Sequence, residues 1–249
     1  MSDFLKHWAD YLSDLPLCFA TVSGAHAYGF PSPDSDVDLR GAHQDRLEDV
    51  VGLRTPKQTW DRMGVHQGVE VDLVSHELGK YLQLLTKRNG YILEQVFSPL
   101  VVVGDEFLAE LRPLAANCVT KHHYHHYRGF FATQRKKLDS EPVRKVKTLL
   151  YAYRVLLTGI HLMRTGEVEM DLRKLCDLES RGDLQELVEI KRRGERVEMP
   201  PGDSDAHDRQ LAALEVELDE SYAESTLPEN PDKEAVHQFL VRRRLATRD

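Results

Sequence analysis

The stretch SGAHAYGFPSPDSDVDLRG, residues 23–41, joins a turn-rich loop to a segment with two closely spaced aspartates. Apolar Val37 and Leu39 alternate there with Asp36 and Asp38, and this period of two indicates a β-strand whose carboxylates share one face. Carboxylates two residues apart on a strand lie roughly 6–7 Å from each other. Left alone they repel each other, whereas Mg²⁺ takes oxygen ligands from both. The string SPDSD is also typical of an ordinary turn, and the aspartate pair alone does not distinguish the two. A metal site is predicted because a Ser-Gly turn precedes the pair and a third aspartate, Asp72, follows on a later strand.

The segments around this stretch predict a sheet with helices beside it. Residues 15–24 form a short apolar run that ends in Ser-Gly, which is typical of a buried strand. Residues 68–77 alternate again and place Asp72 on one face with Glu70, so that a third carboxylate can join the first two. A helix is predicted at the N-terminus and another after this strand, with Ser75 as its N-cap. The N-terminal part is therefore α/β or α+β.

From about residue 117 the pattern becomes helical. Between residues 146 and 160, apolar side chains recur at spacings of three and four, which indicates a strong amphipathic helix. Similar patterns cover residues 184–190 and 211–218. The charged string KRRGER, residues 191–196, is interpreted as a solvated helix end.

Composition excludes several protein classes. The chain has 249 residues, 41% of them hydrophobic and 30% charged, with a net charge of −8. It lacks the run of about 18 apolar residues that a membrane-spanning helix needs, and its first residues lack the apolar core of a signal peptide. The three cysteines are far apart and match neither a zinc spacing nor a disulfide framework. We expect a cytoplasmic protein without a membrane partner.

Positive charge is concentrated in one segment, which we call the basic belt. Residues 121–154 hold nine Lys and Arg against two acids, whereas the segments before and after are net negative by seven and eight charges. Such a belt attracts phosphate groups. The same pattern is equally typical of a solvated helix face.

Two groups of side chains in the basic belt are candidates for ligand binding. One helical stripe consists of Lys147, Tyr151 and Arg154, which are spaced by four and three. These side chains can bind a triphosphate and stack on a base. Alternatively they form an exposed helix edge on which the tyrosine is half-buried. The string HHYHH, residues 122–126, is interpreted as a helix that faces phosphate or RNA. A zinc site is the less favoured interpretation, because no acidic or Cys partner lies nearby in the sequence.

The opening stretch resembles the nucleotidyltransferase signature of the DNA polymerase β superfamily: Gly-Ser or Ser-Gly, a spacer, Asp-x-Asp, and a later aspartate on a strand. The strings AYG, SDVDLRG, VEVDLVSHELGKYLQLLTKRNGYILEQVFSPLVV and RVLLTGIHLMRTGEV resemble more closely a predicted nucleotidyltransferase family linked to bacterial RNA-repair operons, over about residues 23–195. The chain departs from the commonest pattern because Ser23 precedes Gly24 and Ala25 stands where serine is frequent. Ser23 or backbone amides must then hold the phosphates.

The resemblance implies a Mg²⁺-dependent, or Mn²⁺-dependent, transfer of a nucleoside monophosphate from an NTP to a hydroxyl group, with release of pyrophosphate, as in transferases of the EC 2.7.7 type. It implies that Asp36 and Asp38 bind both metal ions. Asp72 binds the catalytic ion and helps to deprotonate the acceptor hydroxyl. The expected nucleotide-binding residues are Ser23, Gly24, His26, Ser35, Lys147, Tyr151 and Arg154.

The resemblance also implies the domain organisation. We expect a polymerase-β-like α+β domain with a mixed sheet and flanking helices at residues 1–115, and a mostly helical domain at residues 116–249 that completes the nucleotide and acceptor site.

Three functions are compatible with the sequence. The first is transfer to an RNA end, with tRNA as a natural candidate, since the basic belt suits nucleic acid while the overall acidity limits the contact to a short end. The second is transfer to a protein or a small molecule. The third is a catalytically silent nucleotide sensor, which three convergent carboxylates argue against because binding alone does not need them.

Overall fold

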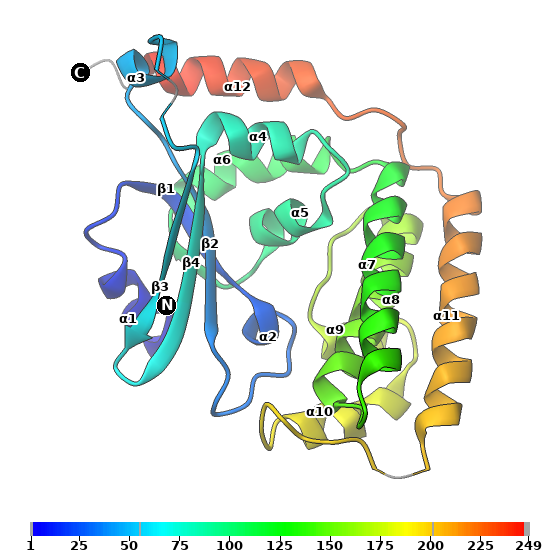
Figure 1. The fold of residues 1–249 in the computed structure, drawn as a ribbon. Helices are drawn as coiled ribbons and strands as arrows, with labels where there is room; N and C mark the ends of the chain where they lie inside the picture. The colour runs from blue at the N-terminus through cyan, green and yellow to red at the C-terminus, as the bar shows by residue number, and fades with distance from the viewer. Residues whose placement is uncertain (1, 55, 201, 247–249) are drawn as a thin grey trace. The chain divides into compact units, whose positions relative to one another are not determined.

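In the part of the chain that the structure describes, which is every residue except 1, 55, 201 and 247–249, a five-stranded sheet forms the centre of the N-terminal half (Figure 1). The strands are β1 (Leu17–Ser23), β2 (Val37–His43), β3 (Thr59–His66), β4 (Val69–Glu77) and β5 (Val101–Val103). Their order is β3-β4-β2-β1-β5, in which β2 and β4 run parallel and the other neighbours antiparallel. This computed structural model confirms the predicted α+β class with a mixed sheet.

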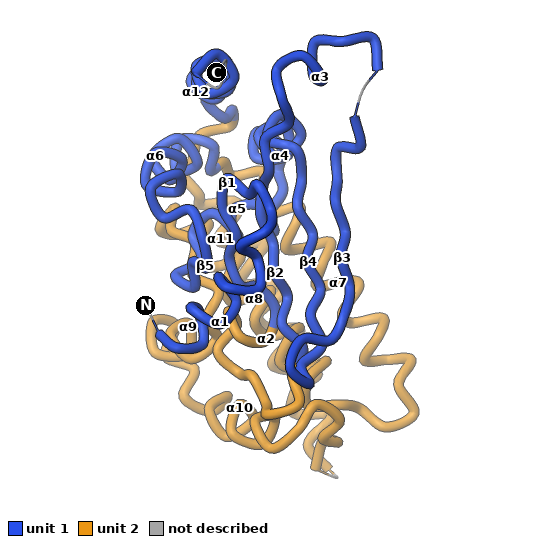
Figure 2. Tube along the Cα trace, turned by 90° about the vertical axis from the view of Figure 1, so that its left-hand side faces the viewer, with its two compact units in different colours: residues 1–24, 36–119, 230–249 blue, residues 25–35, 120–229 orange. Residues whose placement is uncertain are grey.

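The chain divides into two units, shown in Figure 2. Unit 1 comprises residues 1–24, 36–119 and 230–249, and unit 2 comprises residues 25–35 and 120–229. Residues 25–35 belong to the unit with the helices, and residues 230–249 belong to the unit with the sheet. The division into a catalytic domain at residues 1–115 and a helical domain at residues 116–249 that completes the site remains a prediction.

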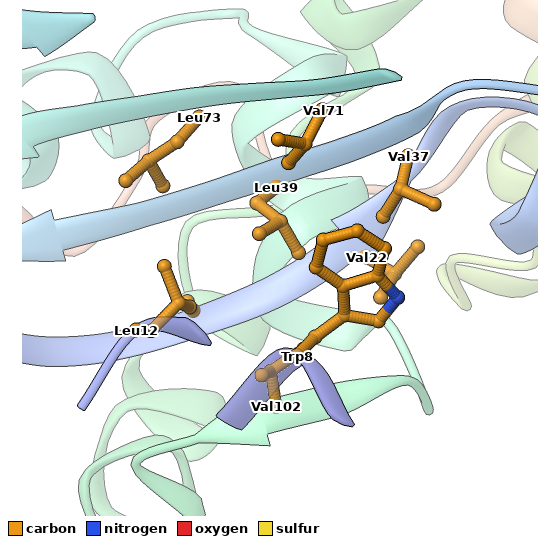
Figure 3. Packing of buried hydrophobic residues seen from close by; sticks show 9 residues of the cluster. Trp8, Leu12, Val22, Val37, Leu39, Val71, Leu73 and Val102 are labelled. Atoms are coloured by element: carbon orange, nitrogen blue, oxygen red, sulfur yellow. The ribbon is translucent and has the colours of Figure 1, made fainter. Parts of the chain in front are cut away.

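Helices cover both faces of the sheet in unit 1. The helices of unit 1 are α1 (Asp3–Tyr11), α3 (Leu47–Val51), α4 (Leu78–Leu85), α5 (Gly90–Phe97), α6 (Asp105–Ala116) and α12 (Lys233–Ala246). Trp8 of α1 and the following Leu12 pack on one face against Val22, Leu39 and Leu73 from three adjacent strands (Figure 3). On the other face the Phe19 ring packs against Tyr81 of α4 and Phe107 of α6, with centroids 5.2 and 5.8 Å away.

The C-terminal helix α12 returns to unit 1. Its Phe239 ring packs against Phe107 of α6 at 5.7 Å, and Arg244 Nη2 donates to Glu77 Oε1 at 2.8 Å. The backbone amide of Asp232, just before the helix, donates to the carbonyl of Asn117. These long-range contacts explain why the helix belongs to the sheet-containing unit, which no local pattern indicates.

Unit 2 is a group of helices packed around α8 (Val146–Thr165). Sixteen of the α8 residues are buried, in agreement with the predicted apolar spacing, and the helix ends before Gly166, whose φ of +77° is the left-handed conformation that glycine adopts most easily. The neighbouring helical segments are η1 (Lys121–His123), α7 (Tyr124–Ser140), α9 (Leu172–Leu178), η2 (Gly182–Leu184), α10 (Gln185–Lys191) and α11 (Ser204–Glu224).

The predicted helix cap at Ser75 is wrong. Ser75 is a buried residue of β4, and its hydroxyl lies 2.8 Å from Nδ1 of His43 on β2. Pairing with both neighbouring strands extends β4 to Glu77, whose carboxylate accepts hydrogen bonds from the amides of Gly79 and Lys80 and so caps α4. None of the described helices is both long enough and apolar enough to span a lipid bilayer.

Candidate active site

The strand register brings Ser23, Asp38 and Asp72 side by side. Ser23 at the end of β1 pairs with Asp38 in the antiparallel β1–β2 ladder, and Asp38 pairs with Asp72 in the parallel β2–β4 ladder. Directly paired residues project to the same face of a sheet. This face is opposite to the one that α1 covers, because Leu39 and Leu73, one residue further along, project into the α1 core.

Arg40 joins the two aspartates. Its Nη2 atom lies 2.7 Å from Asp38 Oδ1 and 2.8 Å from Asp72 Oδ2, and its Nη1 atom donates to the backbone carbonyls of Leu39 and Asp72 at 2.9 and 2.6 Å. The three side chains are 21–30% exposed. Two like charges placed opposite each other on neighbouring strands destabilise a sheet, and the guanidinium offsets this repulsion.

Gly24 allows the turn after β1 to approach the carboxylate of Asp38. Gly24 has a φ of +63°, and a Cβ atom at this position would lie 2.1 Å from Asp38 Oδ2. A side chain here would therefore strain the backbone and collide with the carboxylate. The short helix α2 (Gly24–Ala27) begins at this residue and contains the partly buried His26. The predicted Ser23-Gly24 turn thus lies directly against the predicted metal ligand.

The predicted triad is assembled in part. Asp38 and Asp72 meet, whereas Asp36 is exposed and lies one residue before β2. Within the described residues, no three His, Cys, Asp or Glu side chains are grouped closely enough to hold a metal ion. The donor chemistry of the pair nevertheless suits a cation, since one nitrogen already lies within 2.8 Å of an oxygen from each carboxylate. The three-carboxylate metal site remains a prediction.

Ser35 is part of a buried polar cluster inside unit 2. Its Oγ donates to Glu195 Oε1 at 2.6 Å. The fully buried ammonium of Lys191 donates to Ser32 Oγ, Ser35 Oγ and Glu195 Oε1 at 2.8, 3.1 and 2.8 Å. The interpretation of residues 191–196 as a solvated helix end is therefore wrong at Lys191. Its three acceptors supply the partners that a buried ammonium requires, and they tie residues 25–35 to α10.

Glu195 has an unusually low pKa. Burial would raise this pKa, but hydrogen bonds from Lys147, Lys191 and Ser35 outweigh burial and lower it to about 2. Lys147 Nζ lies 2.7 Å from Glu195 Oε2. Glu195 is therefore the shared acceptor for two lysines from two helices of unit 2.

We predict that the Glu195 carboxylate makes the stability of unit 2 dependent on pH. A lowered folded-state pKa stabilises the fold above the ordinary value of 4.5, and this contribution is lost as the pH falls through about 2. Over that window the free energy of unfolding should lose about 2–3 kcal/mol from this group. Urea unfolding monitored by circular dichroism, at a series of pH values, measures the effect.

Two variants make this measurement specific. Glu195→Gln should be less stable at neutral pH and should lack this part of the acid sensitivity. Glu189→Gln on α10 is the matched control, because Glu189 is 63% exposed and pairs only with Arg192 among the ion pairs seen in the described structure. Equal acid sensitivity of the two variants would contradict the role of Glu195.

The predicted stripe on α8 lies against residues 25–35. The Tyr151 ring makes edge contacts with Tyr28 and Phe30, at centroid distances of 5.5 and 5.6 Å. Arg154 is fully buried, with its guanidinium carbon 3.8 Å from the centre of the Tyr28 ring. Together with the Lys147–Glu195 pair, these contacts hold the loop inside unit 2. Contact of Lys147, Tyr151 and Arg154 with a nucleotide remains a prediction.

The histidine-rich segment has internal structural contacts. His123 is buried, and its Nδ1 accepts a hydrogen bond from the backbone amide of Thr120 at 3.1 Å, which caps η1. Burial lowers the pKa of His126 to about 4. The less favoured zinc interpretation gains no support, because no metal-binding group is found among the described residues.

Acidic partners neutralise much of the basic belt. Lys121, Arg128 and Lys147 pair with Glu229, Glu215 and Glu195 respectively. Arg135 and Arg144 both pair with Asp208 on α11 and with Asp139. These acids come from within unit 2, so the belt attracts phosphates less strongly than its local sequence charge suggests.

The sequence model of a family described as "RNA repair pathway DNA polymerase beta family" matches residues 6–242. The uncharacterized protein MJ0002 of Methanocaldococcus jannaschii is 32% identical over 223 residues, which cover 87% of this chain and 89% of the relative. The uncharacterized protein YcgL of Bacillus subtilis is 28% identical over 192 residues, covering 74% and 72%.

Among solved structures, a nucleotidyltransferase-like protein from Exiguobacterium sibiricum matches 87% of this chain and 72% of its own. The sequence identity is 11% and the TM-score is 0.32.

Proposed function

Because the chain belongs to the RNA repair pathway DNA polymerase beta family, we propose that it is a metal-dependent nucleotidyltransferase that moves a nucleoside monophosphate from an NTP to a hydroxyl group at an RNA end. The family confirms the resemblance predicted from the sequence and supports a nucleotidyltransferase of the polymerase β superfamily. The observation that carries the proposal is the register of Ser23, Asp38 and Asp72 on three adjacent strands.

The carboxylates of Asp36, Asp38 and Asp72 are the proposed ligands of Mg²⁺ or Mn²⁺. Carboxylate oxygens are the ligands that these hard cations prefer. When bound, such an ion neutralises charge on the phosphates and orients the attacking and leaving oxygens. The Asp38–Asp72 pair already accommodates one cationic nitrogen in the structure, so the donor set suits a positively charged ligand.

The chain's own residues have distinct proposed roles. The Ser23-Gly24 turn presents its hydroxyl and backbone amides to the triphosphate, and the missing Cβ of Gly24 lets this turn lie against Asp38. Asp72 accepts the proton of the attacking hydroxyl on a carboxylate oxygen. The transfer then forms one P–O bond to the acceptor and breaks the bond to pyrophosphate.

An RNA end is the proposed acceptor, since the family is described by RNA repair. The net charge of −8 and the acidic partners of the basic belt favour a short contact with an end over a long duplex footprint. Because acidic partners neutralise part of the basic belt, transfer to a protein or a small molecule is the second candidate function.

The test is incorporation of each α-³²P-labelled NTP, added separately with Mg²⁺, into total RNA, protein and small-molecule fractions. Label that enters RNA, is removed by RNase and is absent with Asp36→Ala and Asp38→Ala supports the proposal. Label in protein or in a small product identifies the second candidate. Binding of the NTP without any transfer would contradict an enzymatic function.

A further inference from the structure

Arg40 is placed to hold both carboxylates of the candidate site at once. It lies two residues after Asp38 on β2, so both side chains project to the same face of the strand. A single nitrogen, Nη2, contacts Asp38 and Asp72, while Nη1 is bound to two backbone carbonyls. The guanidinium is therefore oriented by four hydrogen bonds in a fixed geometry.

The contact involves the oxygens that a metal ion needs. Asp38 Oδ1 and Asp72 Oδ2 lie within 2.8 Å of the same Arg40 nitrogen. A divalent ion held by Asp38 and Asp72 would need the carboxylate oxygens that the Arg40 guanidinium contacts, and the two positive charges would repel each other. The three side chains are 21–30% exposed, so the arginine has access to solvent when it leaves.

We infer that Arg40 is an internal counter-cation that competes with the divalent metal ion for Asp38 and Asp72 and so weakens the metal affinity of the site. This inference rests on the proposed function, because it concerns the same two carboxylates. It makes metal binding an exchange of one cation for another. Binding of the ion therefore requires displacement of Arg40 from both aspartates.

A purely structural role for Arg40 predicts the opposite change in metal affinity. If the arginine only aligned the two carboxylates for the ion, its removal would disorder the ligands and weaken binding. If it competes for the same oxygens, its removal strengthens binding. The sign of the change in dissociation constant therefore separates the two roles.

The experiment is titration of the full chain with Mn²⁺ at constant ionic strength, with free Mn²⁺ measured by electron paramagnetic resonance. Arg40→Gln should bind Mn²⁺ about ten- to hundredfold more tightly than the wild type, the range that corresponds to losing a charged hydrogen-bond partner. Arg40→Lys keeps the positive charge but has one nitrogen in place of the two guanidinium nitrogens that make these contacts. Its Mn²⁺ affinity should therefore lie between those of the wild type and Arg40→Gln.

Two controls assign the change to this site. Arg62→Gln removes the same charge from β3, where Arg62 lies 3.7 Å from Asp14, and should leave Mn²⁺ affinity near the wild-type value. Asp38→Asn added to Arg40→Gln should abolish the tight binding. As a second readout, Arg40→Gln should melt at a lower temperature than the wild type without Mn²⁺ and gain more from added Mn²⁺.

Each outcome decides the role of Arg40. Mn²⁺ binding by Arg40→Gln that is equal to or weaker than binding by the wild type overturns the competition. If the single substitution Asp38→Asn nevertheless abolishes Mn²⁺ binding, the proposed function stands without a competing role for Arg40. Absence of Mn²⁺ binding in every variant also overturns the competition, because removing the competitor must reveal the site. The transfer assay on the wild type then judges the proposed function separately. If Arg40→Gln fails to fold, an Arg40→Lys affinity no higher than that of the wild type contradicts the inference.

Discussion

Replacing Asp38 by asparagine should lower the rate of nucleotide transfer by about a thousandfold or more, because the variant loses the charge of a proposed metal ligand without a change in side-chain shape. Asp38 lies at the centre of the site, paired with Ser23 on one side and Asp72 on the other. Single-turnover transfer of labelled nucleotide measures the loss directly.

The variant must be folded for this loss to be informative. Asp38→Asn leaves the Arg40 guanidinium with the single carboxylate of Asp72, so a modest decrease in melting temperature is expected. Asp61→Asn is the matched control. Asp61 is an exposed carboxylate of β3 in the same sheet, where it pairs with Lys57, and its removal should leave the transfer rate unchanged. A folded Asp38→Asn protein with wild-type activity would refute the assignment of the site.

Gly24→Ala is expected to disrupt the site through the backbone. The alanine Cβ would meet Asp38 Oδ2 at 2.1 Å, and the φ of +63° is unfavourable for any residue with a side chain. The conformation alone costs about 1–2 kcal/mol, and the collision adds to that cost by displacing either the turn or the carboxylate. We expect a loss of transfer activity of about a hundredfold or more and a clear decrease in the free energy of unfolding.

Gly68→Ala is the control that isolates the collision. Gly68 has a φ of +86° in the turn between β3 and β4, and a Cβ atom there would meet no other atom within 4 Å. It should cost about 1–2 kcal/mol from backbone strain alone and leave transfer unaffected. Urea unfolding and the transfer assay on both variants provide the comparison. Equal losses in the two variants would mean that contact with Asp38 is unimportant.

Local pattern was sufficient to predict the strands that carry the site. The period of two around Asp38 and around Asp72 placed each carboxylate on the polar face of its strand, because neighbouring apolar residues must enter the core. The helical spacing in residues 146–160 predicted α8 for the same reason. By contrast, β3 was missed, since most of its residues are exposed and no apolar alternation marks it.

The sequence alone determined the class of fold, the motif and the strands that carry Asp38 and Asp72, because these depend on periodicity and on residues close together in the chain. The tertiary structure decided which residues meet. Strand register set Asp38 beside Asp72 and gave Arg40 two partners. Long-range packing assigned residues 25–35 and α12 each to a different unit from the residues next to them in the sequence. It also buried Lys191 beside Ser32, 159 residues away along the chain. Such pairings depend on the free energy of packing the whole chain, which no short window of sequence contains.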